Sequence, residues 1–207
     1  KRQGAKEGGA GVTLEEVVNV VEGVEGEVDA VIEEIGEVEE VGSREGKGRK
    51  MCTARPSWMS ISQQKLGYKD KMYKVELGAL QDVLRIDTDA MEVTVEPNVT
   101  IGFLNRLLVS KGVTLAVVPE LDSLTIGGLL MGGGIESTSH KHGLFHRLAV
   151  EVELVTAEGE CLTVSEEQHQ DIFRALPMSY GTLGFIVSVK LRLLKYRPYI
   201  RLEYRPT

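Results

Sequence analysis

The sequence predicts a mixed α+β fold, and three observations lead to this prediction. From residue 50 onward, the chain is dominated by short apolar or alternating segments bounded by turn residues, which is typical of β-strands. A few other segments repeat apolar residues at the three-to-four spacing of an amphipathic helix. The two kinds of segment do not alternate regularly, so the order is not that of a parallel βαβ sheet.

The bulk composition is that of a globular chain. Its 207 residues, 42% hydrophobic and 27% charged, can form one sizeable core or two small lobes that share an interface. Cys52 and Cys161 give neither a disulfide framework nor metal-ligand spacing, so reduced thiols are expected. No apolar run is long enough for a transmembrane helix, so the chain as given is expected to be soluble. Because it begins at Lys1, it is expected to be trimmed or partial.

The charge distribution is uneven. Residues 13–42 hold eleven Asp and Glu and no Lys or Arg; removing that −11 from the net −7 leaves the remainder at +4. A mildly basic body suits a small anionic ligand. It is too weak a signal for a nucleic-acid surface.

Residues 1–46 are predicted to be a Gly-rich and acidic N-terminal extension that is partly helical. Residues 1–12 are expected to be loose, and a helix begins at Thr13, with Glu16 completing a capping box. Its apolar stripe forms either a coiled-coil seam or a face docked on its own domain; glycines and valines weaken both versions. The stripe comprises Leu14, Val17, Val21, Val24, Val28, Val31, Ile35 and Val38.

The rest of the chain is predicted to contain strands and two short helices. Thr100 caps the first helix, whose end is marked by Gly112. Ser165, followed by Glu166, Glu167 and Gln168, opens the second. The inward residues of the first helix are Ile101, Leu104, Leu107 and Leu108. The strands are predicted at residues 51–54, 73–77, 83–86, 91–96, 114–118, 148–156, 161–164, 184–194 and 199–204, with 148–156 and 161–164 forming a hairpin about 157–159.

The segment LTIGGLLMGGGIESTSHKHG, residues 124–143, holds five glycines between Gly127 and Gly134. The Rossmann fingerprint fails because Ser137 stands where its last glycine belongs, and the P-loop fails because Gly133 replaces its lysine. Glycine backbones can still turn successive N–H groups toward an anion, so two such turns, at 127–128 and 132–134, are predicted to follow a diphosphate. The alternative is that the glycines permit close packing of strands.

Three histidines follow the glycines. His140, His142 and His146 match no strong zinc pattern, so no metal site is expected. The chain has no G-x-S-x-G nucleophile elbow, which argues against a Ser–His hydrolase. We expect ordinary hydrogen-bonding histidines beside a ligand.

Four separated motifs resemble the FAD-binding domain of the vanillyl-alcohol-oxidase (PCMH-type) flavoprotein superfamily. They are VEPNVTIGFLNRLL, VVPELDSLTIGGLLMGGGIESTSHKHGLF, VELVTAEGE and DIFRALPMSYGTLGFIVSVKLRLL. Within the superfamily, MCTARPSWMSIS, PELDSLTIGGLLMGGGIESTSHKHGLF and SYGTLGF are most similar to the delta(24)-sterol reductase (DIMINUTO-type) family. This implies a two-lobed FAD-binding domain with mixed sheets flanked by helices, covering residues 47–207, with lobes at about 47–98 and 99–195.

The resemblance also implies a binding surface. Residues 125–137 would line the diphosphate and ribityl groups, residues 181–187, including Thr182, would approach the adenine or the flavin ring, and residues 51–58 would form the other wall. The implied cofactor-binding residues are Thr125, Ile126, Gly127, Gly128, Leu129, Leu130, Met131, Gly132, Gly133, Gly134, Ile135, Glu136, Ser137, Ser139, His140, Gly143, Gly181, Gly184, Ile186, Val187, Arg55 and Trp58.

The first wall departs from the superfamily pattern. TARPSW, residues 53–58, stands where most members have an Arg-Gly-Gly-Gly-like loop, and Ala54 and Ser57 replace glycines of the sterol reductases. The segment has no histidine, so a noncovalent FAD is expected. Arg55 would meet a phosphate or remain solvated, and Trp58 would pack on the cofactor or in the core.

The implied reaction is the reduction of a sterol side-chain double bond, with NADPH as the reductant of FAD. The implied location is the endoplasmic reticulum membrane. The family's membrane anchor and C-terminal substrate domain have no counterpart here, so association with that missing domain, or through the acidic Val-rich helix, is expected. The catalytic residues stay unknown; Glu120, Glu136, His140 and Lys141 are titratable candidates for the proton donor. The alternatives are a sugar or alcohol oxidase of the same superfamily and a truncated, non-catalytic flavin-binding or interaction module.

Overall fold

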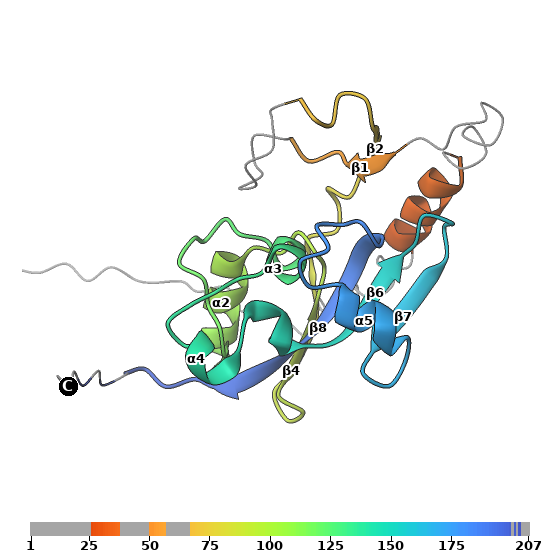
Figure 1. Cartoon of the computed structure of the whole chain (residues 1–207). Coiled ribbons are helices and arrows are strands. Elements are labelled where there is room, and N and C mark those ends of the chain that lie inside the picture. The colour runs from red at the N-terminus through yellow and green to blue at the C-terminus, as the bar shows by residue number, and fades with distance from the viewer. Residues whose placement is uncertain (1–25, 38–49, 57–66, 200, 202, 204–207) are drawn as a thin grey trace, which may run out of the picture.

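A computed structural model describes residues 26–37, 50–56, 67–199, 201 and 203. Its main body is a six-stranded antiparallel sheet, ordered β3-β4-β8-β6-β7, with β5 paired to the C-terminal end of β8. Figure 1 labels β4, β8, β6 and β7 of this sheet. The strands are β3 (Val83–Asp87), β4 (Glu92–Val95), β5 (Val113–Leu115), β6 (Ala149–Val155), β7 (Cys161–Ser165) and β8 (Phe185–Lys195). The long β8 is central, because β4, β5 and β6 all pair with it.

The core of the body lies between this sheet and two helices, α2 (Ile101–Ser110) and α3 (Ile126–Gly132). Leu104 and Leu108 of α2 and Ile126 of α3 are fully buried in one cluster with Val189 and Leu191 of β8. The buried side chains of β8 therefore form the surface against which α2 and the glycine-rich helix α3 pack.

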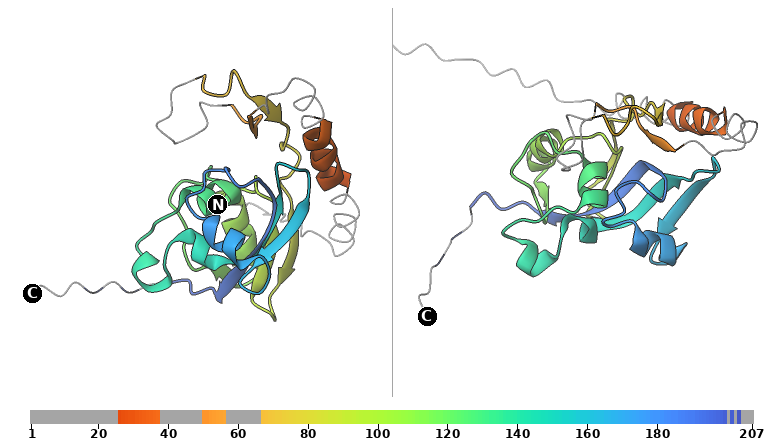
Figure 2. Two further views of the ribbon diagram at one scale, coloured as in Figure 1. Left: turned by 45° about the vertical axis from the view of Figure 1, so that its right-hand side comes forward. Right: turned by 45° about the horizontal axis from the view of Figure 1, so that its top comes forward.

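A second, parallel sheet of two strands, β1 (Met51–Thr53) and β2 (Tyr73–Val75), lies beside the body (Figures 1 and 2). Residues 26–37 form a helix whose Val31 and Ile35 are buried against Val75, Val155 and other apolar residues. This part of the predicted apolar stripe docks on its own domain, which favours that interpretation over a coiled-coil seam. Residues 1–25 and 38–49, including Thr13 and the predicted start of the helix, lie outside the described residues.

The helix after Thr100 forms as predicted. The hydroxyl of Thr100 accepts a hydrogen bond from the Phe103 N–H at 3.4 Å, and Ile101, Leu104 and Leu108 are buried. Leu107 is only half-buried, which corrects its predicted inward position. Gly112 follows the helix with φ of 78°, a left-handed conformation that glycine adopts without a steric penalty.

Eight of the nine predicted strand segments contain a strand, and residues 149–155 and 161–165 form the predicted antiparallel hairpin. The segment 114–118 is a strand only as far as Leu115. The predicted final strand is wrong for the described residues Tyr199, Arg201 and Glu203, none of which has strand structure. The alternation of apolar residues there has no partner strand in the described part of the chain.

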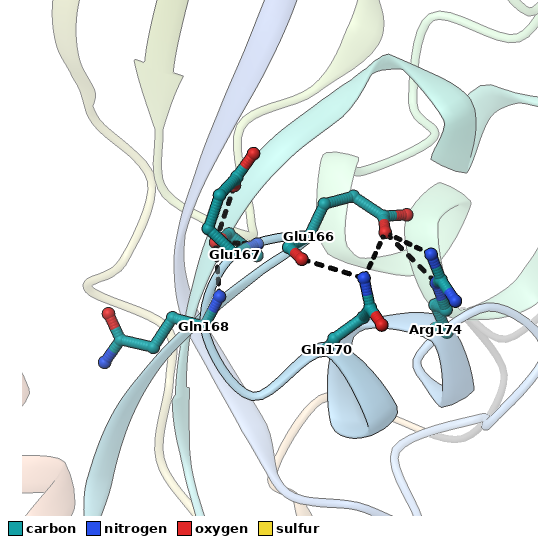
Figure 3. A network of polar contacts seen from close by, with 6 residues as sticks. Glu166, Glu167, Gln168, Gln170 and Arg174 are labelled. Atoms are coloured by element: carbon teal, nitrogen blue, oxygen red, sulfur yellow. Dashed lines mark hydrogen bonds and ion pairs between the residues drawn. The ribbon is translucent and has the colours of Figure 1, made fainter.

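The second short helix, α5 (Gln170–Ala175), has His169 as its N-cap, four residues after the predicted cap Ser165. The Ser165 hydroxyl accepts hydrogen bonds from the Glu167 and Gln168 N–H groups, both at 3.1 Å, so it closes a turn instead of capping a helix. Glu166 then accepts hydrogen bonds from Gln170 and from Arg174, which fastens this turn to α5 (Figure 3).

The domain boundaries stay predictions. The chain passes from the two-stranded sheet to the six-stranded sheet between β2 and β3, because β3 and β4 already pair within the six-stranded sheet. Within the described residues, no helix is both long and apolar enough to cross a membrane.

Candidate functional site

The glycine-rich segment folds as a short helix, α3, instead of two turns. Its apolar residues Ile126, Leu129 and Leu130 are buried, and the N–H groups of Ile126 and Gly127 donate to the carbonyls of Val99 (3.0 Å) and Pro97 (2.9 Å). These two donors are occupied by the protein, so they do not face a ligand. The predicted turn at 127–128 is therefore wrong; tertiary contacts outweigh the low helix propensity of glycine.

The second predicted turn is reduced to one residue. Gly133 has φ of 78° and ends α3, its N–H donating to the Leu129 carbonyl at 3.0 Å. Neither Gly132 nor Gly134 has a positive φ. The chain turns sharply at one glycine, not at three.

Two of the glycines serve close packing within the protein. A Cβ at Gly127 would stand 2.9 Å from the Cβ of Pro97, and one at Gly134 would stand 2.9 Å from Leu129 Cδ2 and 3.0 Å from Phe145 Cβ. Such contacts are too short for carbon atoms. At these positions close packing accounts for the glycine, as the alternative interpretation expected, but the packing partners lie in helices and loops and not in strands.

Gly128 and Gly132 differ from these. They are one helical turn apart and so lie on one face of α3. A Cβ built at Gly128 would meet only the Thr125 hydroxyl, at 3.0 Å, and a Cβ built at Gly132 would meet only Tyr180 Cε1, at 3.9 Å. The rest of the space beside these two glycines is open. A planar or anionic group can therefore approach the backbone of α3 from this side without meeting a side chain of α3 itself.

Arg55 lies at one end of this open face. Its Nη1 donates a hydrogen bond to the Thr125 hydroxyl, the N-cap residue of α3, at 3.2 Å. The contact joins two segments 70 residues apart in the sequence, the predicted first wall and the glycine-rich segment. Their predicted proximity is observed, and it places a permanent positive charge beside the open backbone.

Exposed apolar side chains lie at the other end. Met178, Tyr180 and Ile135 are 48%, 67% and 73% exposed. The Tyr180 N–H donates to the Met131 carbonyl at 3.3 Å, and the Met178 side chain fills the space where a Cβ of Gly133 would be. Met178 and Tyr180 both have positive φ, a conformation that is uncommon for such side chains. The sequence reasoning did not select these two residues, since a positive φ outside glycine leaves no compositional signal.

Residues 181–187 divide between surface and core. Gly181 and Thr182 are exposed, and a Cβ at Gly181 would be 3.9 Å from Met131 Sδ. Gly184 packs so tightly that a Cβ would overlap the Val155 carbonyl oxygen. Ile186 and Val187 are buried in the two apolar clusters, so they support the surface from beneath.

The Ser-His-Lys tail of the segment forms a small helix, α4 (Ser139–His142), and uses its polar side chains locally. The Ser139 hydroxyl accepts the Glu136 N–H at 2.9 Å, and His140 Nδ1 lies 2.6 Å from the Ser137 carbonyl oxygen. Gly143 ends this helix with φ of 80°. Local hydrogen bonds therefore account for the positions of the Ser139 and His140 side chains. The predicted contact of Ser139, His140 and Gly143 with a cofactor stays a prediction.

The proton-donor candidates do not form a cluster that identifies one of them. Glu120, His140 and Lys141 are exposed, and Glu136 is half-buried.

Burial, followed by the charge of Arg147, lowers the pKa of His146, whose Nδ1 has no partner within the described residues. Over the same residues, no group of three His, Cys, Asp or Glu is placed to hold a metal ion. Trp58 and Ser57 lie outside the described residues.

Three features therefore meet at one surface: an open glycine backbone, a guanidinium and exposed apolar side chains. The backbone and Arg55 suit a diphosphate, and the apolar side chains suit an adenine or isoalloxazine ring. These residues fit a flavin dinucleotide.

Comparison with known proteins agrees with this chemistry. A family model described as FAD binding domain matches residues 32–165. The chain is 44% identical over 162 residues to human delta(24)-sterol reductase, covering 78% of this chain and 31% of that protein. The corresponding protein of Arabidopsis thaliana is 40% identical over 158 residues, 75% of this chain and 28% of that protein. Bovine L-gulonolactone oxidase is 32% identical over 120 residues, 58% of this chain and 27% of that protein.

Solved structures share the fold. A carbohydrate oxidase from Microdochium nivale superposes with a TM-score of 0.64 at 22% identity, covering 75% of this chain and 32% of that one. The 6-hydroxy-D-nicotine oxidase of Arthrobacter nicotinovorans gives a TM-score of 0.61 at 18% identity, covering 78% and 35%. These likenesses confirm the predicted α+β, PCMH-type architecture.

Proposed function

The chain belongs to the FAD-binding-domain family, and from this premise we propose that it is the cofactor domain of a flavin-dependent oxidoreductase of the delta(24)-sterol reductase type. The observation that carries the proposal is the contact between Arg55 and Thr125, because it brings the two matching segments together beside the open face of α3. The chain spans about a third of the length of the sterol reductases that it matches, so substrate and activity belong to the proposal.

In this proposal the chain's residues bind and orient the cofactor noncovalently. Arg55 holds the diphosphate, which lies in the open space beside Gly128 and Gly132, while Met178 and Tyr180 offer apolar surface to a ring. The bound FAD would supply hydride transfer, with NADPH as its reductant and a sterol side-chain double bond as the acceptor. None of the described residues stands out as the proton donor for that reduction.

The first experiment asks whether the purified chain binds FAD. We expect a yellow protein that releases its flavin on denaturation, or a colourless one that regains flavin on reconstitution. A chain that is folded, colourless and unable to take up FAD would overturn the proposal. The whole protein would then be tested for NADPH-dependent reduction of a sterol that carries a side-chain double bond.

A second candidate is an FAD-dependent sugar or alcohol oxidase. The likeness to bovine L-gulonolactone oxidase favours it, although both the identity and the share of the chain covered are lower than for the sterol reductases. Oxygen-dependent oxidation of a sugar or lactone, with no sterol reduction, would support this candidate. A non-catalytic flavin-binding or interaction module would bind FAD and show neither reaction.

Localisation at the endoplasmic reticulum membrane, the sterol partner and association with a further domain follow from the resemblance alone. Association through the acidic Val-rich helix would have to use faces other than that of Val31 and Ile35, which are buried within the chain. Fractionation of cells that express the whole protein tests the membrane location: recovery in the microsomal pellet supports it, and recovery in the cytosol contradicts it.

A further inference from the structure

Lys69 is a buried lysine that the binding surface described above does not include. It lies in the turn before β2, and 8% of its surface is exposed. Buried lysines are rare in proteins unless their charge is paired or fully hydrogen-bonded. The described residues place no carboxylate within salt-bridge distance of Lys69, so hydrogen bonds have to hold the ammonium group.

All three donors of that ammonium group point at the segment that carries Arg55. Lys69 Nζ donates to the Thr53 carbonyl at 2.7 Å, to the Thr53 hydroxyl at 2.9 Å and to the Arg55 carbonyl at 2.7 Å. An ammonium has three N–H bonds, so its donors are saturated by these three oxygens. The Thr53–Arg55 segment is therefore held by one side chain, that of Lys69.

These hydrogen bonds restrict the backbone that carries Arg55. The backbone of Thr53 and Arg55 is fixed on one side by Lys69, and the Ala54 N–H donates to the Val75 carbonyl at 2.8 Å. With the Thr53 and Arg55 carbonyls held by Lys69, the Arg55 side chain reaches Thr125 from a fixed backbone. An arginine whose orientation is already set loses less conformational entropy when it binds an anion.

We propose that Lys69 is a positioning residue for the cofactor site, which holds the Thr53–Arg55 segment so that the Arg55 guanidinium stands beside the open face of α3. The proposal rests on the proposed function, because the anion that Arg55 meets is taken to be the FAD diphosphate. Lys69 touches no ligand itself. It acts through Arg55.

The test is a double-mutant cycle on the affinity for FAD. Lys69→Met keeps most of the side-chain stem and removes all three donors, and we expect FAD to bind about tenfold more weakly, as for a lost hydrogen bond to a charged group. Arg55→Met should give a similar loss. Because Lys69 acts through Arg55, the double variant should bind FAD no more weakly than Arg55→Met alone, whereas independent roles would give additive losses and overturn the proposal.

Lys71→Met is the matched control, since it removes the same charge from an exposed position in the same turn. Its affinity for FAD should stay within about twofold of the unmodified chain. An equal loss in Lys71→Met and Lys69→Met would attribute the effect to net charge and contradict the positioning role.

A readout without FAD separates this inference from the proposed function. In the unmodified chain, the NMR signals of the Arg55 Nε–H and the Thr125 amide should differ from solvent-exposed values, and both should shift in Lys69→Met. Unchanged signals would overturn the positioning role whether or not the chain binds FAD. If Lys69→Met does not fold, Thr53→Val removes one of the three acceptors; the same signals should then shift partly, and their constancy would equally refute the role.

Discussion

Two pairs of glycines within eight residues do opposite things in this molecule. Gly127 and Gly134 press against Pro97, Leu129 and Phe145. Gly128 and Gly132 lie on a more open side of α3, where an added Cβ would meet only the Thr125 hydroxyl at 3.0 Å and Tyr180 Cε1 at 3.9 Å, respectively. Both pairs look the same in the sequence. The difference shows that a glycine cluster can be required for the fold on one face and for ligand approach on the other.

This comparison makes the two requirements separable by mutation. A side chain added on the packed face should change the stability of the fold, and one added on the open face should change binding with the fold retained.

Gly134→Val should give the largest loss of stability. A Cβ there meets Leu129 Cδ2 at 2.9 Å and Phe145 Cβ at 3.0 Å, and overpacking of a core costs about 1–3 kcal/mol, here at the upper end because Phe145 is fully buried. Urea unfolding followed by circular dichroism measures it. A stability equal to that of the unmodified chain would remove the distinction between the two faces.

Glu96 supports the packed face, because it directly precedes Pro97, whose carbonyl accepts the Gly127 N–H. The carboxyl of Glu96 is fully buried; its Oε2 accepts the Asp82 N–H at 2.6 Å, and its Oε1 has no partner among the described residues. Burial raises the pKa of Glu96 from 4.5 to about 7, with smaller contributions from the charges of Glu27 and Asp82.

The pKa shift predicts a loss of stability as pH rises. The folded state keeps the Glu96 proton up to about pH 7, while the unfolded state loses it near 4.5, so the stabilisation is present at low pH and disappears between these values. The difference in stability across this pH range is on the order of 3 kcal/mol. Glu96→Gln should flatten the pH dependence of the free energy of unfolding between pH 4.5 and 7. An unchanged pH dependence would contradict the assignment to Glu96.

Gly132→Ala should have a small effect on stability in the opposite direction. The nearest atom to the new Cβ is Tyr180 Cε1 at 3.9 Å, an ordinary contact, and replacing glycine by alanine in a helix stabilises by up to about 1 kcal/mol. Affinity for FAD should nevertheless fall, since the methyl group stands on the open face. A gain in stability with unchanged affinity would show that this face does not meet the cofactor.

Arg174→Ala should have the smallest effect. Arg174 pairs with Glu166 at 2.6 Å on the exposed surface of α5, and exposed ion pairs contribute little because solvent screens them. We expect no measurable change in either the unfolding midpoint or the affinity for FAD. A clear loss of FAD affinity would mean that the binding surface extends to α5.

Most strands could be predicted from the sequence, because alternation of apolar residues reflects burial on one face of a sheet. The helix α3 could not, since three of its seven residues are glycines and its first two N–H groups are held by Pro97 and Val99, about 30 residues earlier in the chain. The helix predicted to begin at Ser165 was wrong for a related reason. A serine hydroxyl can either cap a helix or close a turn, and here it accepts the Glu167 and Gln168 N–H groups of a turn.

The site was predictable as a region but not in its details. The family resemblance predicted that residues 51–58 would form a wall of the site opposite the glycine-rich segment, and the hydrogen bond from Arg55 to Thr125 brings these two segments together. Which glycines are open depends on side chains from elsewhere, such as Pro97 and Tyr180. Nothing in the sequence indicated that Lys69 is buried, because a lysine in a polar turn normally stays in solvent.

An FAD titration of the unmodified chain and of Gly132→Val, with an unfolding curve for each, decides whether the open face of α3 meets the cofactor. We expect the unmodified chain to bind FAD, and Gly132→Val to bind it at least about tenfold more weakly while its unfolding curve is retained. An unmodified chain that is folded and binds no FAD, or a Gly132→Val variant that binds FAD equally well, would contradict this expectation.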